Sequence, residues 1–461
     1  GTALAFTVLE YPALMHLTLA ATSAGNTAKG FVVDRSTYVL CEDVRVSAFS
    51  TNIHVTGSDT VASGIVQLSN INSREFTTVG IQIDHAVDTY LSNVDNYAVS
   101  GNPTNARGII IDTGASGIEG KNVNNGSSGL LLRNSTPTVN TYGKPPNFVF
   151  FDQLVCDSAP TVGLEFAASL DTAGGVGSAF YGYAFRFSHT MVAATQTTGD
   201  SGIKISGGRD ISFVNCISRF NKLHGLELAG GTNMRFTNCH FNANNIQAHA
   251  SGSGVSVAAG VSNWQILGGT SGDETNEDAG SPQKYGYFIA VGASNNYVIA
   301  HTRAMNNDTA AISDGGTGNN KLILNVWTGA SQDALVNSKQ WSVGDNLFYM
   351  DITTSTHPLL AFDTNDYFGF DRTNYYHWVV GGSDLMKLDS NSHLAVGGGL
   401  IVGNAATTGG VSGGILFSEI TAPSAPAANK GTMWVEDNGA GKSRLMIRFA
   451  SGASQQIAIE P

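Results

Sequence analysis

A short pattern of apolar and variable positions recurs along the chain: a glycine, an apolar residue, a variable residue and a second apolar residue. Because successive side chains of a β-strand point to opposite faces, each copy predicts a short strand with two buried apolar residues and one outward residue. No apolar stripe with helical spacing accompanies these copies. The pattern therefore predicts an all-β chain, with strands that follow Gly30, Gly64, Gly80, Gly108, Gly129, Gly163, Gly202, Gly225, Gly254 and Gly286.

Two of these copies belong to a longer repeat with a period of 23 residues, formed by residues 202–218 and residues 225–241. The equivalent pairs are Gly202 and Gly225, Phe213 and Phe236, Asn215 and Asn238, and Cys216 and Cys239. A fixed period of this length indicates stacked supersecondary units. Units made of short strands with Gly and Asn turns stack as the coils of a parallel β-helix, which is the fold class we predict.

Changes in the pattern divide the chain into four segments. Residues 1–29 predict an N-terminal entry or cap segment, and residues 30–337 predict the parallel β-helix. Residues 338–420, with dense aromatic residues and short apolar runs between glycines, predict a small C-terminal β domain. Residues 421–461 combine a linker with three short strands. Because so small a sheet is rarely stable alone, we expect it to pack on other copies of itself.

The composition agrees with this fold and argues against two kinds of partner. Glycine accounts for 55 of the 461 residues and charged residues for only 13%, so helix should be scarce. The formal net charge of −12 argues against a nucleic-acid partner, because phosphate binding requires clustered Lys and Arg. No apolar run approaches the roughly 20 residues of a membrane span, so we expect no membrane partner.

The four cysteines have no metal-ligand spacing, and we expect neither a metal nor a cofactor. Cys216 and Cys239 would stack one coil apart, either as a disulfide or, as we expect, as two thiols inside the solenoid. The chain begins Gly-Thr-Ala-Leu without a basic leader segment, so we expect no export signal, and we expect that Gly1 is not the natural start.

The variable residues of the pattern predict one outward column along the solenoid. Its early part is apolar, which indicates a protein–protein contact unless the register of these irregular coils is wrong. Its middle part is charged. The predicted column contains Val32, Val66, Gln82, Ile110, Leu131, Glu165, Arg186, Lys204, Glu227, Ser256 and Phe288.

Together these features resemble phage tailspikes and tail-fibre depolymerases with a pectate-lyase-like, right-handed parallel β-helix. The resemblance covers residues 30–335 through the coil pattern, and residues 385–399 and 431–445 through motifs common in C-terminal tail-fibre modules. It implies a homotrimeric spike on the virion tail, synthesised in the host cytoplasm and active outside the host cell. It also implies a virion-attachment domain before Gly1, and binding and cleavage of a bacterial surface polysaccharide, either capsule or O-antigen.

Candidate catalytic residues lie on and beside the charged part of the column. Glycoside hydrolysis needs two carboxyl groups, about 5–5.5 Å apart for retention and about 6.5–9.5 Å apart for inversion. Glu227 is the best single candidate, with a partner from the acidic loop that contains Asp273 and Glu274. Glu165 lies three coils away in the predicted column, about 14 Å, and would pair with Arg186. Each carboxylate has the alternative of being an ordinary solvated or salt-bridged surface residue.

His224 precedes the strand of Glu227 and is a candidate base, or else a turn residue with a structural hydrogen bond. In a lyase, nearby cations would stabilise the charge on a uronate, and His224 or Tyr285 would be the base. Aromatic residues would stack on sugar rings or else fill the core. The substrate-binding candidates are Lys204, Arg186, Arg219, Arg235, Tyr285, Phe288 and Trp264.

Three functions remain open at this point. The first is a trimeric tailspike that hydrolyses a surface polysaccharide with carboxylate acid–base chemistry. The second is a polysaccharide lyase on the same scaffold, although the signature motifs of polygalacturonases and some pectate lyases are absent. The third is a receptor-binding spike without catalysis. A secreted, non-viral β-helix fits less well, because the C-terminal motifs resemble tail fibres and no export signal is seen.

Overall fold

The computed structural model describes residues 2–7, 9–22, 27–101, 105–138, 143–173, 181–196, 200–244, 252–272, 283–293, 296–316, 320–324 and 326, seven strands between residues 338 and 396, and residues 421–428 and 430–459. The chain divides into two compact units, Gly1–Ser383 with Leu388–His393, and Asp384–Lys387 with Leu394–Pro461. In these residues the elements are strands, except for the 3₁₀ helix η1 (Ala168–Asp171). None of the described helical segments has the length and hydropathy needed to cross a membrane.

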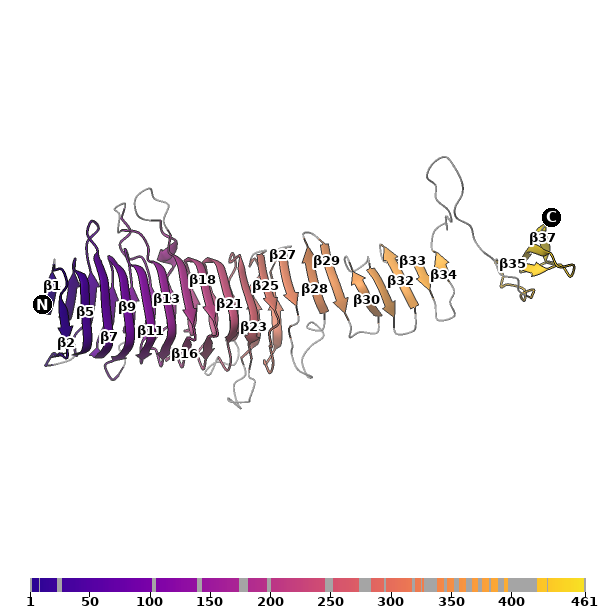
Figure 1. The fold of residues 1–461 in the computed structure, drawn as a ribbon. Coiled ribbons are helices and arrows are strands. Elements are labelled where there is room, and N and C mark those ends of the chain that lie inside the picture. Colours follow the sequence, from indigo (N-terminus) through magenta and orange to yellow (C-terminus); the bar gives the residue numbers. More distant parts are fainter. Residues whose placement is uncertain are drawn as a thin grey trace, which may run out of the picture. The chain divides into compact units, whose positions relative to one another are not determined.

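Twelve parallel strands form the first sheet, in which consecutive strands pair with each other and lie on consecutive coils. The coils stack along the solenoid in Figure 1. Its strands are β1 (Thr2–Thr7), β4 (Lys29–Asp34), β6 (Thr51–Thr56), β8 (Val79–Ile83), β10 (Arg107–Ile111), β12 (Gly129–Leu132), β14 (Leu164–Phe166), β17 (Ile203–Ile205), β20 (Leu226–Leu228), β22 (Ser253–Val257), β24 (Tyr285–Ile289) and β26 (Ala310–Asp314). The first strand lies within residues 1–29, so this segment already contributes a strand to the sheet.

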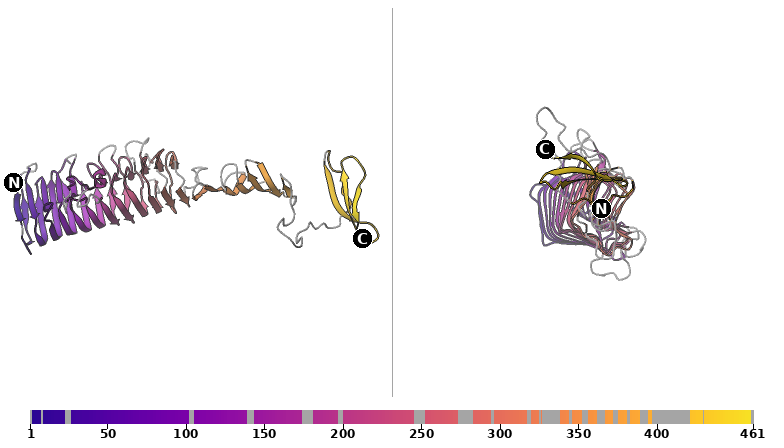
Figure 2. Two further views of the ribbon diagram at one scale, coloured as in Figure 1. Left: turned by 90° about the horizontal axis from the view of Figure 1, so that it is seen from above. Right: turned by 90° about the vertical axis from the view of Figure 1, so that its right-hand side faces the viewer.

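A second parallel sheet completes each coil (Figure 2). Its strands are β2 (Ala13–Met15), β3 (Thr18–Ala20), β5 (Thr37–Ser47), β7 (Ser63–Phe76), β9 (Ala86–Ala98), β11 (Ser116–Gly126), β13 (Asn147–Asp157), β15 (Tyr183–Ser188), β16 (Met191–Ala193), β18 (Arg209–Val214), β19 (Ile217–Arg219), β21 (Thr232–His240), β23 (Trp264–Thr270), β25 (Asn296–Ala300) and β27 (Asn320–Leu324). The predicted parallel β-solenoid is confirmed.

The long strands of the second sheet share a bend near their middle, at a residue in the left-handed backbone region, in addition to residues of this conformation near their starts, such as Tyr38 and Asp88. The bend residues of β5, β7, β9, β11 and β13 are Asp43, Asn70, Asn93, Asn122 and Gln153, with φ between 52° and 59°. Asparagine tolerates this conformation better than most residues. The side chains also form a ladder, because Asn93 Nδ2 donates to Asn70 Oδ1 at 3.0 Å and Asn122 Nδ2 donates to Asn93 Oδ1 at 2.8 Å.

Apolar side chains from both sheets fill the interior of the solenoid. A ladder of phenylalanines follows the second sheet, with ring centroids 5.7, 5.0 and 5.3 Å apart along Phe151, Phe187, Phe213 and Phe236. Burying one such side chain stabilises the fold by about 1.5–3 kcal/mol. All four cysteines are buried and free, Cys216 and Cys239 among them.

The pairing changes from parallel to antiparallel after β27. Leu322 of β27 pairs with Trp341 of β28, and the antiparallel pairing continues through β32. These strands are β28 (Ser338–Val343), β29 (Asn346–Asp351), β30 (Thr356–Ala361), β31 (Tyr367–Asp371) and β32 (Tyr375–Val380), followed by β33 (Ser383–Leu388) and β34 (Leu394–Val396). The four segment boundaries drawn from the sequence stay predictions.

The C-terminal residues form a small antiparallel sheet of β35 (Gly431–Asp437), β36 (Ser443–Phe449) and β37 (Gln455–Ile459). Trp434 on one face is buried, and its Nε1 donates to Glu436 Oε2 at 2.8 Å. Met433 and Phe449 are exposed on the opposite face. The sheet is therefore apolar on a face that its own residues leave uncovered.

Candidate functional site

The outward column of the first sheet brings Glu165, Lys204 and Glu227 together on consecutive coils. Glu165 of β14 pairs in register with Lys204 of β17, which pairs with Glu227 of β20. Glu165 and Glu227 are therefore two coils apart, about 10 Å, and the predicted separation of three coils is wrong. This backbone spacing is slightly larger than the carboxyl separation of about 6.5–9.5 Å found in inverting enzymes.

Two residues of the predicted column lie elsewhere. Arg186 is on β15 in the second sheet, and Val66 is buried on β7 of that sheet. His54 takes the place between Val32 and Gln82 in the first-sheet column. The prediction failed because alternating apolar and variable residues occur in both sheets, so this pattern does not assign a strand to a sheet.

Glu227 is held by a cation and a hydroxyl group from the preceding coil. Lys204 Nζ lies 3.0 Å from Glu227 Oε1, and Ser201 Oγ donates to Glu227 Oε2 at 2.7 Å. A neighbouring cation favours the ionised form of a carboxylate. Glu227 is therefore suited to accept a proton or to orient a water molecule.

Glu165 pairs with Arg107, and not with Arg186 as predicted. Arg107 Nη2 donates to Glu165 Oε2, and Nη1 donates to the carbonyl oxygen of Val162 at 2.7 Å. Gly129 lies opposite Arg107 on the intervening strand β12, so no side chain stands between the guanidinium group and β14. Arg107 is mostly buried, and it fixes the carboxylate of Glu165 at the edge of the site.

Asp200 is a third carboxyl group at this site, which the sequence pattern does not single out. Burial raises the pKa of Asp200, the charges of Arg107 and Lys204 lower it, the charges of Glu165 and Glu227 raise it, and the net shift is upward. A carboxyl group whose pKa is pushed above that of its neighbours is suited to donate a proton.

His224 is half-buried beside this site and is neutral at neutral pH. Burial lowers the pKa of His224 to about 4, even though the charge of Glu227 raises it. The backbone N–H of Ser253 donates to Nδ1 of His224 at 3.0 Å. This is the hydrogen bond expected of a structural turn histidine, and it occupies one of the two ring nitrogens that a base would use.

Besides Arg186, three further predicted substrate-binding residues lie away from this site. Trp264 is only 2% exposed and stacks on Tyr297 inside the solenoid, with ring centroids 4.7 Å apart, so it fills the core and cannot stack on a sugar. Arg219 on β19 and Arg235 on β21 belong to the second sheet. They therefore cannot join Lys204 around one sugar on the first sheet.

The remaining candidates extend the first-sheet column or lie outside the described residues. Phe288 is two coils beyond Glu227 in the same column, and its ring centroid is 5.4 Å from that of Tyr285. Asp273 and Glu274 lie outside the described residues. Their role as partners of Glu227 stays a prediction.

A second polar cluster surrounds Asp84 at the N-terminal end of the first sheet. His54 Nε2 is 2.6 Å from Asp84 Oδ2, and His54 Nδ1 is 2.6 Å from Lys29 Nζ. His85 bridges two carboxylates, with Nδ1 3.3 Å from Asp84 Oδ1 and Nε2 2.9 Å from Asp59 Oδ1. In the described part of the chain, no three His, Cys, Asp or Glu side chains are arranged to hold a metal ion.

Hydrogen bonds and neighbouring charges shift the pKa values of Asp84 and His85 in this cluster. Burial alone would raise the pKa of Asp84, but hydrogen bonds from His54, His85 and Thr56 and the charge of His54 bring it well below its usual range. The hydrogen bond to Asp84 raises the pKa of His85, although burial opposes this. The sequence prediction missed the cluster because the column was built without the strand of His54.

No protein-family model matches the chain, and no curated protein matches its sequence. Similar solved structures include pectate lyase Pel9A (11% identity, TM-score 0.33, 71% of this chain and 79% of the other). They also include bacteriophage CBA120 tailspike protein 3 (12%, TM-score 0.35, 75% and 55%) and the siphovirus 9NA tailspike receptor-binding domain (8%, TM-score 0.28, 98% and 93%). These are the two groups of proteins that the sequence pattern resembles. Because these identities and TM-scores are low, the parallel β-helix is assigned from the strand register of this chain and not from the similar structures.

Proposed function

We propose that this protein binds a bacterial surface polysaccharide and cleaves it by glycoside hydrolysis at the first-sheet site. The observation that carries the proposal is the grouping of Glu165, Asp200 and Glu227 around Lys204 on the outer face of adjacent coils. Two of these carboxylates are paired with cations, and the third has a raised pKa. Glycosidases need this combination of one protonated and one ionised carboxyl group.

Each residue has a role that follows from its surroundings. Asp200, whose pKa is raised, protonates the glycosidic oxygen as the leaving group departs. Glu227, which is paired with Lys204 and oriented by Ser201, activates the attacking water. Glu165 and Arg107 form a fixed ion pair that bounds the site, while burial is the main cause of the raised pKa of Asp200.

A lyase is the weaker alternative. It requires a base for the proton next to the uronate carboxylate and free cations for the developing charge. His224 is half-buried with one ring nitrogen occupied, and both Lys204 and Arg107 are already paired with carboxylates. These observations favour hydrolysis.

The kind of protein, its oligomeric state and its substrate are proposed from the sequence resemblance to phage tailspikes. By that resemblance the protein is a homotrimeric phage tailspike, attached to the virion tail through a further N-terminal domain, and its substrate is a capsule or O-antigen. The uncovered apolar face with Met433 and Phe449 supports association between copies.

Variants of the two proposed acid–base residues test this function. We expect Asp200→Asn and Glu227→Gln each to lower the rate of reducing-end release from purified capsular and O-antigen polysaccharides by about 10²–10⁴-fold. Asp210→Asn, an exposed carboxylate on the neighbouring strand β18, is the matched control and should keep the full rate. Full activity in both variants, or products with the ultraviolet absorbance of an unsaturated uronate, would overturn the proposed hydrolysis.

A further inference from the structure

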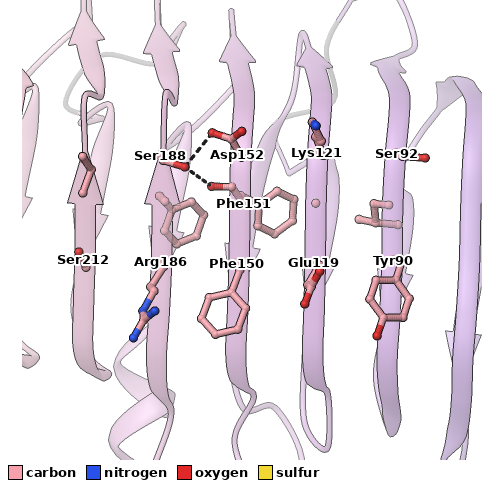
Figure 3. A pocket seen from close by; sticks show the side chains of 14 residues that line it. Tyr90, Ser92, Glu119, Lys121, Phe150, Phe151, Asp152, Arg186, Ser188 and Ser212 are labelled. Atoms are coloured by element: carbon pink, nitrogen blue, oxygen red, sulfur yellow. Dashed lines mark hydrogen bonds between the residues drawn. The ribbon is translucent and has the colours of Figure 1, made fainter.

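The second sheet carries a groove that is separate from the carboxylate site. It is a hollow of about 590 Å³ on the outer face of this sheet, a size typical of small-molecule sites. Figure 3 shows its polar and aromatic side chains in two rows across five coils. One row contains Tyr90, Glu119, Phe150, Arg186 and Ser212, and the other contains Ser92, Lys121, Asp152 and Ser188.

Two aromatic rings in the first row provide flat apolar surfaces. Tyr90 pairs in register with Glu119, and Glu119 pairs with Phe150, so the two rings are two coils apart, about 10 Å. Tyr90 is 38% exposed, and Phe150 is partly exposed. The spacing of the two aromatic rings matches a polysaccharide in which every second sugar ring stacks on an aromatic side chain.

Charged groups lie beside the rings. The guanidinium carbon of Arg186 is 5.5 Å from the ring centroid of Phe150. Within the described residues, neither Arg186 nor Glu119 has an ion-pair partner. A cation and a carboxylate next to flat rings are available to bind sugar hydroxyl or acidic groups through hydrogen bonds.

The second row is polar, and hydrogen bonds within the protein hold its Asp152 side chain in place. Ser188 Oγ donates to Asp152 Oδ1 at 2.7 Å (Figure 3). His189 Nδ1 lies 2.8 Å from the same oxygen. The hydrogen bond from His189 lowers the pKa of Asp152, as do the hydrogen bond from Ser188 and the charge of Lys121. Asp152 is therefore ionised and suited to accept hydrogen bonds. Its lowered pKa makes Asp152 a poor proton donor for hydrolysis.

We propose that this groove is a second, non-catalytic binding site for a polysaccharide. The chain would run along the solenoid axis, with sugar rings on Tyr90 and Phe150 and with Arg186, Glu119 and Asp152 bound to its polar substituents. Charges of both signs inside a hollow suit a polar chain better than the flat apolar face of another protein. The site goes beyond the proposed hydrolysis, because it uses none of the residues of the first-sheet site.

The test compares binding by the intact protein and its variants on a printed panel of purified bacterial capsular and O-antigen polysaccharides. We expect Tyr90→Ala and Phe150→Ala each to weaken binding to the recognised polysaccharide by about tenfold. Phe148→Ala removes an exposed ring from the same strand β13 but outside the groove, and it should bind normally. Tyr90→Ala and Phe150→Ala should weaken binding to the same extent in the Asp200→Asn background, which separates this site from the proposed catalysis.

Two further measurements decide between explanations. If the wild-type protein cleaves the recognised polysaccharide, the groove variants should raise KM and leave kcat unchanged. Light scattering should give the same molar mass for Tyr90→Ala, Phe150→Ala and the wild type. Absence of binding to the whole panel, normal binding by both variants, or a change in molar mass that marks the groove as an interface between copies would each overturn the proposal.

Discussion

At the scale of single residues, the protonation state of Asp200 is central to the proposed chemistry. Burial raises the pKa of Asp200, and the charges of Glu165 and Glu227 contribute to the upward shift. The general acid is active only while it is protonated, so cleavage should slow as the pH rises through this raised pKa. A neighbouring like charge therefore extends the activity toward higher pH.

Glu165→Gln tests this coupling. The change removes a negative charge next to Asp200 and leaves Arg107 unpaired, and both effects lower the pKa of Asp200. We expect the alkaline limb of the kcat–pH profile to move to lower pH, while Asp210→Asn leaves it in place. An unchanged alkaline limb in Glu165→Gln would show that Asp200 is not the titrating acid.

The residues around Asp84 make stability depend on pH. The pKa of His85 is raised by Asp84 and Asp59, so its contribution is fully present below the unfolded value of about 6.5 and is lost as the pH rises through the folded pKa. The pKa of Asp84 is lowered, so its contribution is present above about 3.9 and is lost at lower pH.

His85→Gln separates these two effects. At about pH 6 we expect it to lower the free energy of unfolding by about 1.5–3 kcal/mol, since it removes hydrogen bonds between charged groups. At about pH 9 the difference from the wild type should become smaller, because the wild-type histidine is then less protonated. Urea unfolding at both pH values measures this, and an equal difference at both would contradict the assignment.

At the scale of elements, each coil is shaped by its bends and by the strands between them. The bend at Asn93 has φ of 52°, and its side chain bonds to Asn70 and Asn122 on the neighbouring coils. A left-handed backbone costs most L-residues roughly 1–2 kcal/mol. The stability of the bend therefore depends both on the left-handed backbone conformation of Asn93 and on the hydrogen bonds of the asparagine ladder.

Substitutions at Asn93 distinguish these two contributions. Asn93→Ala should lower the free energy of unfolding by about 1–2 kcal/mol, because it loses the ladder hydrogen bonds and strains the backbone. Asn93→Gly loses the same hydrogen bonds but adopts the conformation freely, so it should be less damaging. Urea midpoints measure both changes. A glycine variant that is less stable than the alanine variant would show that the bend is not set by backbone conformation.

The strands themselves follow closely from the sequence, because glycine marks where most first-sheet strands begin. At Gly225 an added Cβ would lie 2.6 Å from Nδ2 of Asn244. The side chain of Asn244 therefore packs directly against the backbone of Gly225, and only glycine leaves room for it. Of the ten copies of the pattern, only that at Gly64 belongs to the second sheet, where β7 begins.

The strand β6 escaped prediction because Asn52 stands where other coils have glycine. Asn52 Nδ2 donates to the carbonyl oxygens of Val46 and Arg74, so this coil fills its corner with its own side chain. Without β6, His54 could not be placed in the column, and the cluster around Asp84 was not predicted.

The sequence pattern did identify part of the candidate site, namely Glu227, Glu165, Lys204 and His224, because these residues lie on or next to strands marked by glycine. Asp200 was not identified, because burial and neighbouring charges decide its role and neither is visible in a strand pattern.

At the scale of the whole molecule, the solenoid gains stability mainly between neighbouring coils. The C-terminal sheet differs, because Met433 and Phe449 lie exposed on a face that the sheet itself leaves uncovered. Apolar surface of this kind is stabilised when another copy covers it. We therefore expect copies of the protein to associate through this face.

Phe449→Glu tests this association. At micromolar concentration, light scattering should give three times the chain mass of 48.1 kDa for the wild type, and a smaller mass for the variant because a buried charge opposes association. Arg448→Glu, on the opposite face of the same strand, is the control and should associate normally. A monomeric wild type would contradict the trimer.

The most direct test of the whole account is a structure of Glu227→Gln with a bound fragment of its polysaccharide. We expect a sugar chain across the first sheet, with the glycosidic oxygen within hydrogen-bonding distance of the carboxyl group of Asp200 and the scissile bond beside residue 227. A sugar chain bound only elsewhere, with none at Asp200, would contradict the proposed catalytic site.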